Sequence, residues 1–189
     1  EILNKLNNSI DLEGLAQHRG SLMGALGLKP NSQKKFENLL MKKLDQLQEQ
    51  GEKFIFIEGE SRRIGDVIIP PFLYKAMLSG IAVDVKRDME LRVKSLVDEY
   101  FKPEHLDEIK EITLGFRRVI SNKKKEEATK FIDEGNLHEA SRIILNDYYD
   151  KLYEHTLNEI DYAFEINADD VDKAVMELKR KLSKLNNSR

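Results

Sequence analysis

The chain has 189 residues, of which 40% are hydrophobic and 34% are charged, a composition typical of soluble globular proteins. No apolar run approaches the ~20 residues that cross a bilayer and no secretory leader opens the chain, so we expect no membrane partner. The net charge of −3 argues against non-specific coating of nucleic acid. The absence of cysteine excludes disulfides, a thiolate zinc site and a cysteine nucleophile within this chain, and suits a cytoplasmic protein.

The first fifty residues predict a strand, a loop and a helix. Residues 1–8 have the pattern of the end of a helix, and because this pattern is already running at the first residue we expect the chain to be a fragment. Residues 9–13 predict a short strand, and the glycine-rich stretch 14–30 predicts a loop. Apolar residues at spacings of three and four predict a helix over 32–51, capped by its serine and ended by its glycine.

The middle and the end of the chain predict further strands around a helical region. Residues 54–57 are a continuous run of β-favouring apolar residues, typical of a strand buried on both faces, and 81–85 and 162–166 are further strand candidates. A short helix is expected over about 72–79, and a last helix after a cap at Asp169 or Asp170. This alternation predicts an α/β fold with a parallel sheet.

Residues 88–160 have an almost wholly helical pattern, with helices expected near 91–100, 123–133 and 137–159. We therefore predict an α/β core built from residues 1–87 and 161–189, and a helical insertion over residues 88–160.

The first motif, DLEGLAQHRGS, spans Asp11 to Ser21. Two acids, Asp11 and Glu13, end the predicted strand, and in open α/β sheets ligands bind beyond the carboxyl ends of strands. Glycines let the backbone approach an anion, and Arg19 offers a planar fork suited to phosphate. A polar loop capped by its own side chains is the alternative, and a lone histidine such as His18 is more often structural.

The second motif, PNSQKKFENLL, spans residues 30–40. The start of its helix could hold an anion through free amides and the helix dipole. A capped amphipathic helix, with Phe36 in the core and Lys34 and Lys35 in solvent, is the interpretation that these residues favour.

The third motif, FIFIEGESRRIG, spans residues 54–65. Four apolar residues followed by Glu58 match the Walker B pattern, in which the acid supports Mg²⁺ or polarises water. Glu60 would share a face with Glu58 in a strand, unless the chain turns at the glycine between them. Arg62 and Arg63 could neutralise phosphate or pair with these acids. The apolar run with its acid is a weak signal, whereas the segment from Glu58 to the last glycine is much less commonplace.

A basic cluster lies in the helical region. Arg117, Arg118, Lys123 and Lys124 could contact an RNA backbone, but Glu126 and its acidic neighbour follow at once, which favours a solvated helix face. The Walker A pattern GxxxxGK[ST] occurs nowhere in the sequence, and without it a Walker B strand cannot hold a nucleoside triphosphate in the usual way.

Taken together and in this order, DLEGLAQHRGS, PNSQKKFENLL and IFIEGESRRIGDVIIP resemble the tRNA 2-selenouridine synthase family. The resemblance implies a P-loop NTPase or kinase-like parallel sheet with a helical insertion. In this family the P-loop precedes the first motif, so the central P-loop strand, between 54–57 and 81–85, is expected to be missing from this chain. A rhodanese domain is the expected partner, fused upstream or as a separate chain.

The resemblance also implies a chemistry: selenium from selenophosphate replaces the sulfur of a wobble 2-thiouridine through a geranylated intermediate made from geranyl diphosphate. Glu58, Glu60 and His18 are then the expected catalytic residues, with the two acids placing Mg²⁺ or orienting arginines. The expected phosphate and substrate ligands are Asp11, Glu13, Arg19, Ser21, Ser61, Arg62 and Arg63. The expected contacts to the tRNA anticodon arm are Arg117, Arg118, Lys123 and Lys124.

Two other functions remain open from the sequence. A small-molecule kinase of the P-loop class would show the same order of strands, but would leave the HRGS and ESRRIG segments unexplained. A non-catalytic RNA-binding or scaffold module should have a broader basic face than this charge balance provides.

Overall fold

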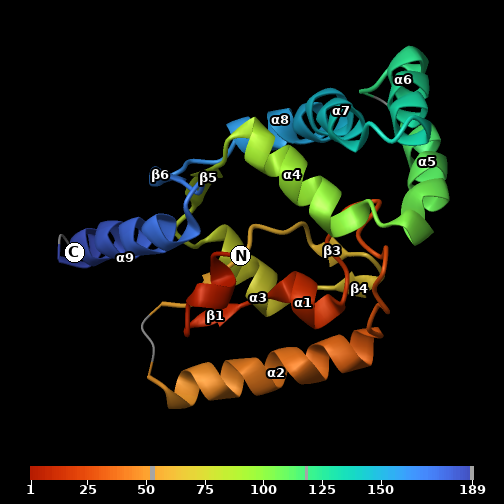
Figure 1. Ribbon diagram of the computed structural model, residues 1–189. Coiled ribbons are helices and arrows are strands. Elements are labelled where there is room, and N and C mark those ends of the chain that lie inside the picture. The colour runs from red at the N-terminus through yellow and green to blue at the C-terminus, as the bar shows by residue number, and fades with distance from the viewer. Residues whose placement is uncertain (52–53, 118, 188–189) are drawn as a thin grey trace. The chain divides into compact units, whose positions relative to one another are not determined.

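The computed structural model describes residues 1–51, 54–117 and 119–187. It divides into two compact units, one formed by Glu1–Ile81 with Ile166–Arg189 and the other by Ala82–Glu165 (Figure 1). Within the described part of the chain, no helix combines the length and the apolar character that a membrane span requires. Each unit is described by itself below.

The first unit begins with short elements. A 3-10 helix, η1 (Leu3–Lys5), leads into β1 (Ser9–Ile10) and the helix α1 (Leu12–Ala16). The prediction of an α-helix end over residues 1–8 is therefore wrong, because the helix there is a short 3-10 helix. The predicted strand over 9–13 is confirmed only for Ser9 and Ile10. The physical reason for the second error is Asp11, whose carboxylate accepts a hydrogen bond from the Gly14 amide and so starts a helix where the strand was expected to continue.

The helix predicted from the second motif is confirmed as α2 (Gln33–Glu49). Ser32 caps it by accepting a hydrogen bond from the Lys35 amide. Its apolar stripe, with Phe36 and Leu40 fully buried, packs on α1 and the strands. The interpretation of this motif as a capped amphipathic helix is thus confirmed.

Strand β2 (Phe56–Ile57) pairs in parallel with β1, with Ser9 opposite Phe56 and Ile10 opposite Ile57. Only the second half of the predicted strand over 54–57 is extended in this pairing. Because parallel strands end at the same edge of a sheet, the residues after β1 and after β2 lie side by side.

A hairpin follows that the sequence analysis did not predict. Strands β3 (Arg63–Ile64) and β4 (Val67–Ile68) are antiparallel and joined by a two-residue turn. Gly65 has a φ of 55° at the first turn position, the arrangement of a type II′ turn, whose backbone twist matches that of the two strands.

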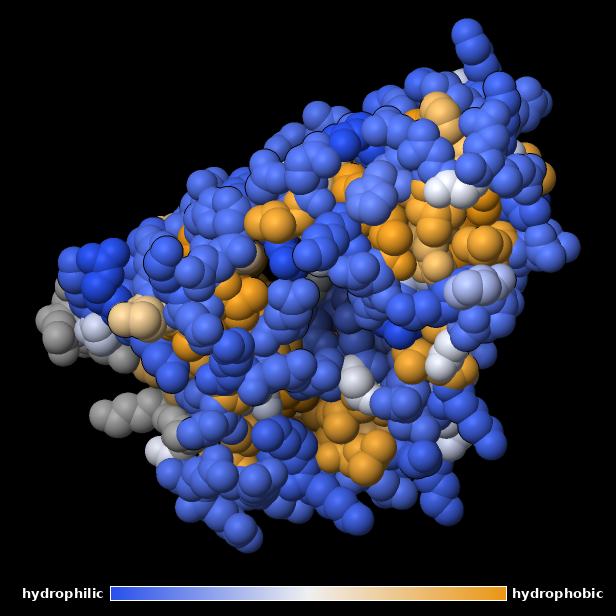
Figure 2. Space-filling view, in the orientation of Figure 1, coloured by the Kyte–Doolittle hydropathy of each residue, from blue (hydrophilic) through white to orange (hydrophobic). Residues whose placement is uncertain are grey.

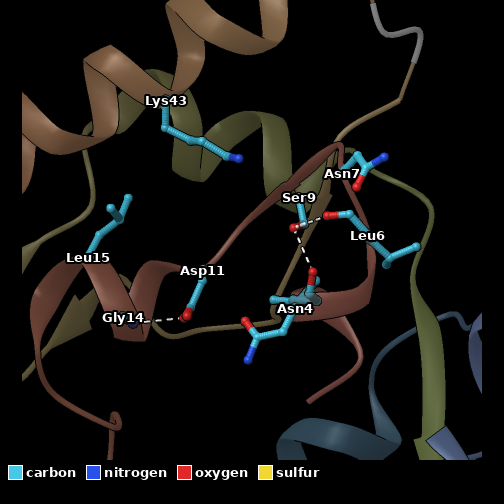
Figure 3. Close-up of a pocket in the computed structure, with 9 residues that line it drawn as sticks. Asn4, Leu6, Asn7, Ser9, Asp11, Gly14, Leu15 and Lys43 are labelled. Carbon is cyan, nitrogen blue, oxygen red and sulfur yellow. Dashed lines mark hydrogen bonds between the residues drawn. The ribbon is translucent and has the colours of Figure 1, made fainter. Parts of the chain in front are cut away.

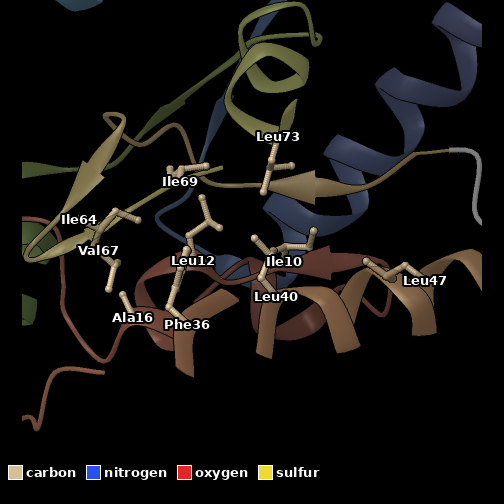
Figure 4. Close-up of a cluster of buried hydrophobic side chains, with 10 residues drawn as sticks. All are labelled: Ile10, Leu12, Ala16, Phe36, Leu40, Leu47, Ile64, Val67, Ile69 and Leu73. Atoms are coloured by element: carbon tan, nitrogen blue, oxygen red, sulfur yellow. The ribbon is translucent and has the colours of Figure 1, made fainter. Parts of the chain in front are cut away.

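The core of the first unit is a cluster of hydrophobic side chains between α2 and the strands (Figure 4). The helix α3 (Pro71–Leu78), confirmed near its predicted place, adds Leu73 to it, while Phe72 and Leu78 of the same helix are exposed. The last helix, α9 (Val171–Asn187), begins after Asp170, whose carboxylate accepts a hydrogen bond from the Lys173 amide as predicted.

The face of the protein shown in Figure 2 is largely hydrophilic, and several hydrophobic side chains are exposed on it.

The second unit is mostly helical. Its helices are α4 (Met89–Tyr100), η2 (Pro103–His105), α5 (Leu106–Gly115), α6 (Asn122–Asp133), α7 (Leu137–Ile143), the π-helix η3 (Ile144–Tyr149) and α8 (Asp150–Asn158). Strand β5 (Val83–Lys86) pairs with β6 (Phe164–Asn167), which begins in this unit, and both lie close to the two strands predicted there.

Two bidentate ion pairs tie α4 to the helices that follow. Arg92 donates to both carboxylate oxygens of Asp150 at 3.0 and 2.5 Å, and Arg142 donates to those of Glu90 at 2.6 and 2.8 Å. The described chain is thus a mixed α/β protein, mostly helical, with small sheets that include the parallel pair β1–β2.

Candidate functional site

Acidic side chains gather at the edge where β1 and β2 end. Asp11 follows β1, and Glu58 follows β2. The Glu13 amide, in the first turn of α1, donates a 2.8 Å hydrogen bond to Oε1 of Glu58. The other oxygen, Oε2, is buried and has no hydrogen-bond partner among the described residues. A buried carboxylate oxygen without a partner is costly, and such groups mark places where a protein binds a ligand or moves a proton.

The surroundings of Glu58 change its acidity. Burial is the main cause that raises the pKa of the Glu58 carboxyl to about 7, and Asp11 and Glu13 raise it further, against the hydrogen bond from the Glu13 amide. Burial and the neighbouring Glu58 also raise the pKa of Glu60. Near neutral pH, Glu58 therefore populates both its protonated and its ionised form, which suits a group that exchanges a proton or binds a cation.

Gly20 brings the first and third motifs together. Its φ of 66° lies in the left-handed region, and a Cβ atom built on it would lie 3.0 Å from both carboxylate oxygens of Glu60 and 3.1 Å from Oε1 of Glu13. The glycine is needed here for both its conformation and its lack of a side chain. The predicted residues Glu13, Glu58 and Glu60 thus form one cluster, which we call the acidic cluster, against the backbone of Gly20.

His18 lies between two further glycines. A Cβ atom on Gly65 would come within 2.6 Å of the imidazole, and one on Gly24 within 2.7 Å. The Gly20 amide donates to Nδ1 of the ring at 3.2 Å, which requires that nitrogen to be unprotonated. Burial lowers the pKa of His18; Asp66 opposes this and Arg19 adds to it. The neutral ring therefore fills the space between the HRGS loop and the β3–β4 turn.

Replacing Gly65 by Ala is expected to lower the free energy of unfolding by about 2–4 kcal/mol, because it combines a left-handed backbone with a clash against the packed imidazole. Gly51→Ala is the matched control: its φ of 68° is similar, but no atom of the described residues lies within 4 Å of the added methyl, so we expect a loss of about 1 kcal/mol. Urea denaturation of the full-length variants measures both. Equal losses would contradict the packing of His18 on Gly65.

The three arginines predicted to bind phosphate differ in the contacts that their guanidinium groups already make within the protein. Arg19 is half-buried and donates to the Leu26 carbonyl at 2.9 Å. Arg63 donates to the Gly65 carbonyl at 2.8 Å and to Asp66 at 3.0 Å. Arg62 is exposed and makes no side-chain hydrogen bond or ion pair with any described residue. Of the three arginines, Arg62 is the one whose guanidinium is available to a ligand.

The two predicted serines lie in the same segments. The Ser61 hydroxyl donates to the Arg63 carbonyl at 2.7 Å, so it supports the chain at the start of the hairpin. Ser21 is half-buried in the turns after His18, where its amide donates to the Arg19 carbonyl at 2.8 Å. Ser21 directly follows Gly20 in the chain, and Ser61 directly follows Glu60.

The basic residues predicted to contact tRNA belong to the second unit. Arg117 and Lys123 are exposed, whereas Lys124 forms an ion pair with Glu127 at 2.9 Å within α6. Arg118 lies outside the described residues. The ammonium of Lys124 is therefore already paired within its own helix.

A pocket of about 350 Å³ lies beside β1 (Figure 3). Lys43 of α2 reaches toward it, and Asn4 and Asn7 line it. Its lining residues are Leu3, Asn4, Leu6, Asn7, Ser9, Asp11, Gly14, Leu15 and Lys43. Of the predicted site residues only Asp11 lines this pocket, so it adjoins the predicted site without containing it.

One further residue, Gln33, organises this region without any signal in the sequence. The Gln33 side chain pairs with the backbone of Ile68 on β4, donating from Nε2 to its carbonyl at 2.9 Å and accepting its amide on Oε1 at 2.7 Å. A signal for the hairpin itself is present, because Gly65 and Asp66 separate Ile64 from the β-branched pair Val67 and Ile68, and a Gly-Asp pair between β-favouring residues is typical of a tight hairpin. Nothing in the sequence indicated the partner of Gln33.

Comparisons with known proteins agree with the motifs. Residues 1–127 match the family model described as the tRNA 2-selenouridine synthase AAA domain. The relatives include tRNA 2-selenouridine synthases of Shewanella piezotolerans (27% identity; 80% of this chain and 49% of the relative), Hydrogenovibrio crunogenus (29%; 82% and 49%) and a Sulfurovum species (30%; 83% and 43%). The chain spans about half the length of these relatives. No solved structure matches it significantly.

Because the family model covers well over half of the chain and the three motifs lie within its range, the chain belongs to the tRNA 2-selenouridine synthase family.

Proposed function

We propose that this chain is the phosphate-handling part of an enzyme that converts wobble 2-thiouridine in tRNA to 2-selenouridine through a geranylated intermediate, with selenophosphate as the selenium donor. The observation that carries the proposal is the position of Glu58. It directly follows β2 at the shared edge of β1 and β2, and its buried oxygen has no hydrogen-bond partner within the described part of the chain. That is the place of a Walker B acid in a P-loop protein. Family membership supports the choice of substrates.

The proposal includes a finer fold. β1 and β2 are two neighbouring strands of a kinase-like parallel sheet whose central P-loop strand is not in this chain. Residues 1–87 and 161–189 form that core, and residues 88–160 form a helical insertion. The parallel register of β1 with β2 supports this arrangement.

In the first chemical step, the sulfur of 2-thiouridine attacks C1 of geranyl diphosphate. A C–S bond forms, the C–O bond breaks, the diphosphate leaves with the bonding electrons, and N3 of the 2-thiouridine ring loses its proton to solvent. Negative charge grows on the leaving diphosphate, so a positioned guanidinium stabilises this transition state more than the ground state. Arg62 is proposed for this role because its guanidinium is exposed and unpaired among the described residues, while Arg19 and Arg63 hold the loops beside it.

The acidic cluster fits Mg²⁺ in one respect. Carboxylate oxygens are the ligands that Mg²⁺ prefers, and a Mg²⁺ site commonly uses one or two carboxylates and takes its other ligands from phosphate and water. The described residues contain no group of three or more potential ligands placed to hold a metal by themselves. Glu58, through its free oxygen, and Glu60 would therefore hold the ion together with the diphosphate, and the bound ion would supply further positive charge to the leaving group.

The tRNA contacts and the protein partner remain proposals as well. Arg117 and Lys123 are exposed in the second unit and are proposed to contact the backbone of the anticodon arm. The same contact is proposed for Arg118, which lies outside the described residues, and for Lys124, which would have to leave its ion pair with Glu127. A rhodanese domain, in the same chain or in another, is the proposed partner.

The test uses the full-length protein with tRNA that carries 2-thiouridine, geranyl diphosphate, selenophosphate and Mg²⁺. After digestion, the nucleosides are weighed by mass spectrometry. We expect geranylated 2-thiouridine when selenophosphate is omitted, and 2-selenouridine when it is present. Unchanged 2-thiouridine in a folded protein, alongside phosphoryl transfer to a small molecule, would contradict the proposal and favour a P-loop kinase.

A further inference from the structure

We propose that His18 and Gln33 are positioning residues, which hold the β3–β4 hairpin so that Arg62 faces the anion site beside the acidic cluster. This inference rests on the proposed function, because it concerns how the same site is kept in shape. It assigns one role to two residues from different motifs, neither of which touches the reacting atoms.

The first support is the contact of His18 with the hairpin turn. Its imidazole occupies the space that a side chain on Gly65 would need, with ring atoms 2.6 to 2.9 Å from the ideal Cβ position. The same ring accepts the Gly20 amide on Nδ1, and Gly20 in turn lies against the carboxylate of Glu60. The ring therefore links the far end of the hairpin to the acidic cluster.

The second support is the pairing of Gln33 with β4. Its amide group makes the two hydrogen bonds to Ile68 that a neighbouring strand would make, at 2.9 and 2.7 Å. On the other side of the hairpin, the Ile69 amide donates to the Arg62 carbonyl at 2.9 Å. The backbone of Arg62 is thus held through β4, which α2 holds through Gln33.

A two-stranded hairpin is at most marginally stable by itself in water, so these outside contacts decide where its side chains lie. The segment from Glu60 to Arg62 is anchored at one end by the packing of Glu60 on Gly20, and at the other by the hairpin. Release of either anchor would let the guanidinium of Arg62 move relative to the carboxylates. Loss of the charge-assisted contact between this guanidinium and a phosphate would weaken anion affinity by about 10- to 100-fold.

The probe is inorganic pyrophosphate with Mg²⁺, titrated calorimetrically into the full-length protein. We expect His18→Leu and Gln33→Met each to weaken binding about 10- to 100-fold. His18→Asn retains a side-chain acceptor for the Gly20 amide and should recover part of the affinity. Gln48→Met, on an exposed position of the same helix, is the matched control and should bind as the wild type does.

Amide hydrogen exchange provides the second readout. We expect Gln33→Met to speed exchange at the Ile68 amide, and His18→Leu to speed it at the Gly20 amide, with thermal unfolding showing that both variants are folded. Unchanged exchange at these amides would overturn the positioning roles, and so would faster exchange with wild-type affinity for pyrophosphate. A wild type that binds no pyrophosphate would contradict the proposed function itself, a result distinct from variants that bind as well as the wild type.

Discussion

Glu58→Gln is expected to make the substrate-free protein more stable at pH 8 and to abolish its proposed activity. The folded-state pKa of Glu58 is raised from 4.5 to about 7, so the folded carboxyl keeps its proton over a pH range in which the unfolded one is ionised. A tenfold change in a group's proton affinity between the folded and unfolded states corresponds to about 1.4 kcal/mol. Because the carboxyl is only partly buried, we expect a gain of about 1–2 kcal/mol in the free energy of unfolding from the neutral amide.

The pH dependence fixes the sign of this effect. The folded state binds more protons at Glu58 than the unfolded state between about pH 4.5 and 7, so this carboxyl makes stability fall as the pH rises through that window. Gln removes that loss, so the two proteins should differ little at pH 4 and most above pH 7. Urea denaturation across this range measures it, with Glu49→Gln, an exposed glutamate of α2, as the control. A variant that is less stable at pH 8 would contradict the raised pKa of this partly buried carboxyl.

A gain in stability with a loss of activity is the combination expected of a binding or catalytic group that is costly to bury. The activity arm uses the nucleoside assay with geranyl diphosphate. Retained geranylation in Glu58→Gln would exclude both the proposed Mg²⁺ contact and a proton-transfer role for this carboxyl, even if the stability result were as expected.

Local signals in the sequence predicted the helices well. Ser32 with the apolar stripe of α2, and Asp170 before α9, are short-range patterns in which the cap and the buried face belong to the same segment. The strand at β2 and the acid after it were predicted from the same kind of signal. Asp11 misled the prediction because its carboxylate serves as a helix cap, so residues that alternate like a strand begin α1 instead.

The contacts that assemble the site could not be predicted from the sequence, because they join residues far apart in the chain. Gln33 pairs with Ile68 across 35 positions, and the Glu13 amide donates to Glu58 across 45. No periodicity or composition encodes such pairs. The arginines illustrate the same limit: Arg62 and Arg63 are equivalent in the sequence, yet only in the structure does Arg63 become occupied by the turn that follows it.

That difference leads to the second large expected effect: Arg62→Ala should lower kcat/KM for geranyl diphosphate by about 10- to 100-fold. A charge-assisted hydrogen bond contributes about 1.5–3 kcal/mol, and each 1.4 kcal/mol is a factor of ten. Since the guanidinium of Arg62 is exposed and unpaired among the described residues, its removal should leave thermal unfolding unchanged. Steady-state kinetics of geranylation by the full-length protein measures the effect.

Arg63→Ala is the matched comparison, one residue away with the same change of charge. It loses exposed contacts to Gly65 and Asp66, so we expect a loss of about 0–1 kcal/mol in stability and a smaller kinetic effect than that of Arg62→Ala. Arg62→Lys should recover part of the activity, because it restores the charge without the planar fork. If Arg63→Ala proved the more damaging change, the anion would have to displace the turn contacts of Arg63, and the assignment of the diphosphate to Arg62 would be wrong.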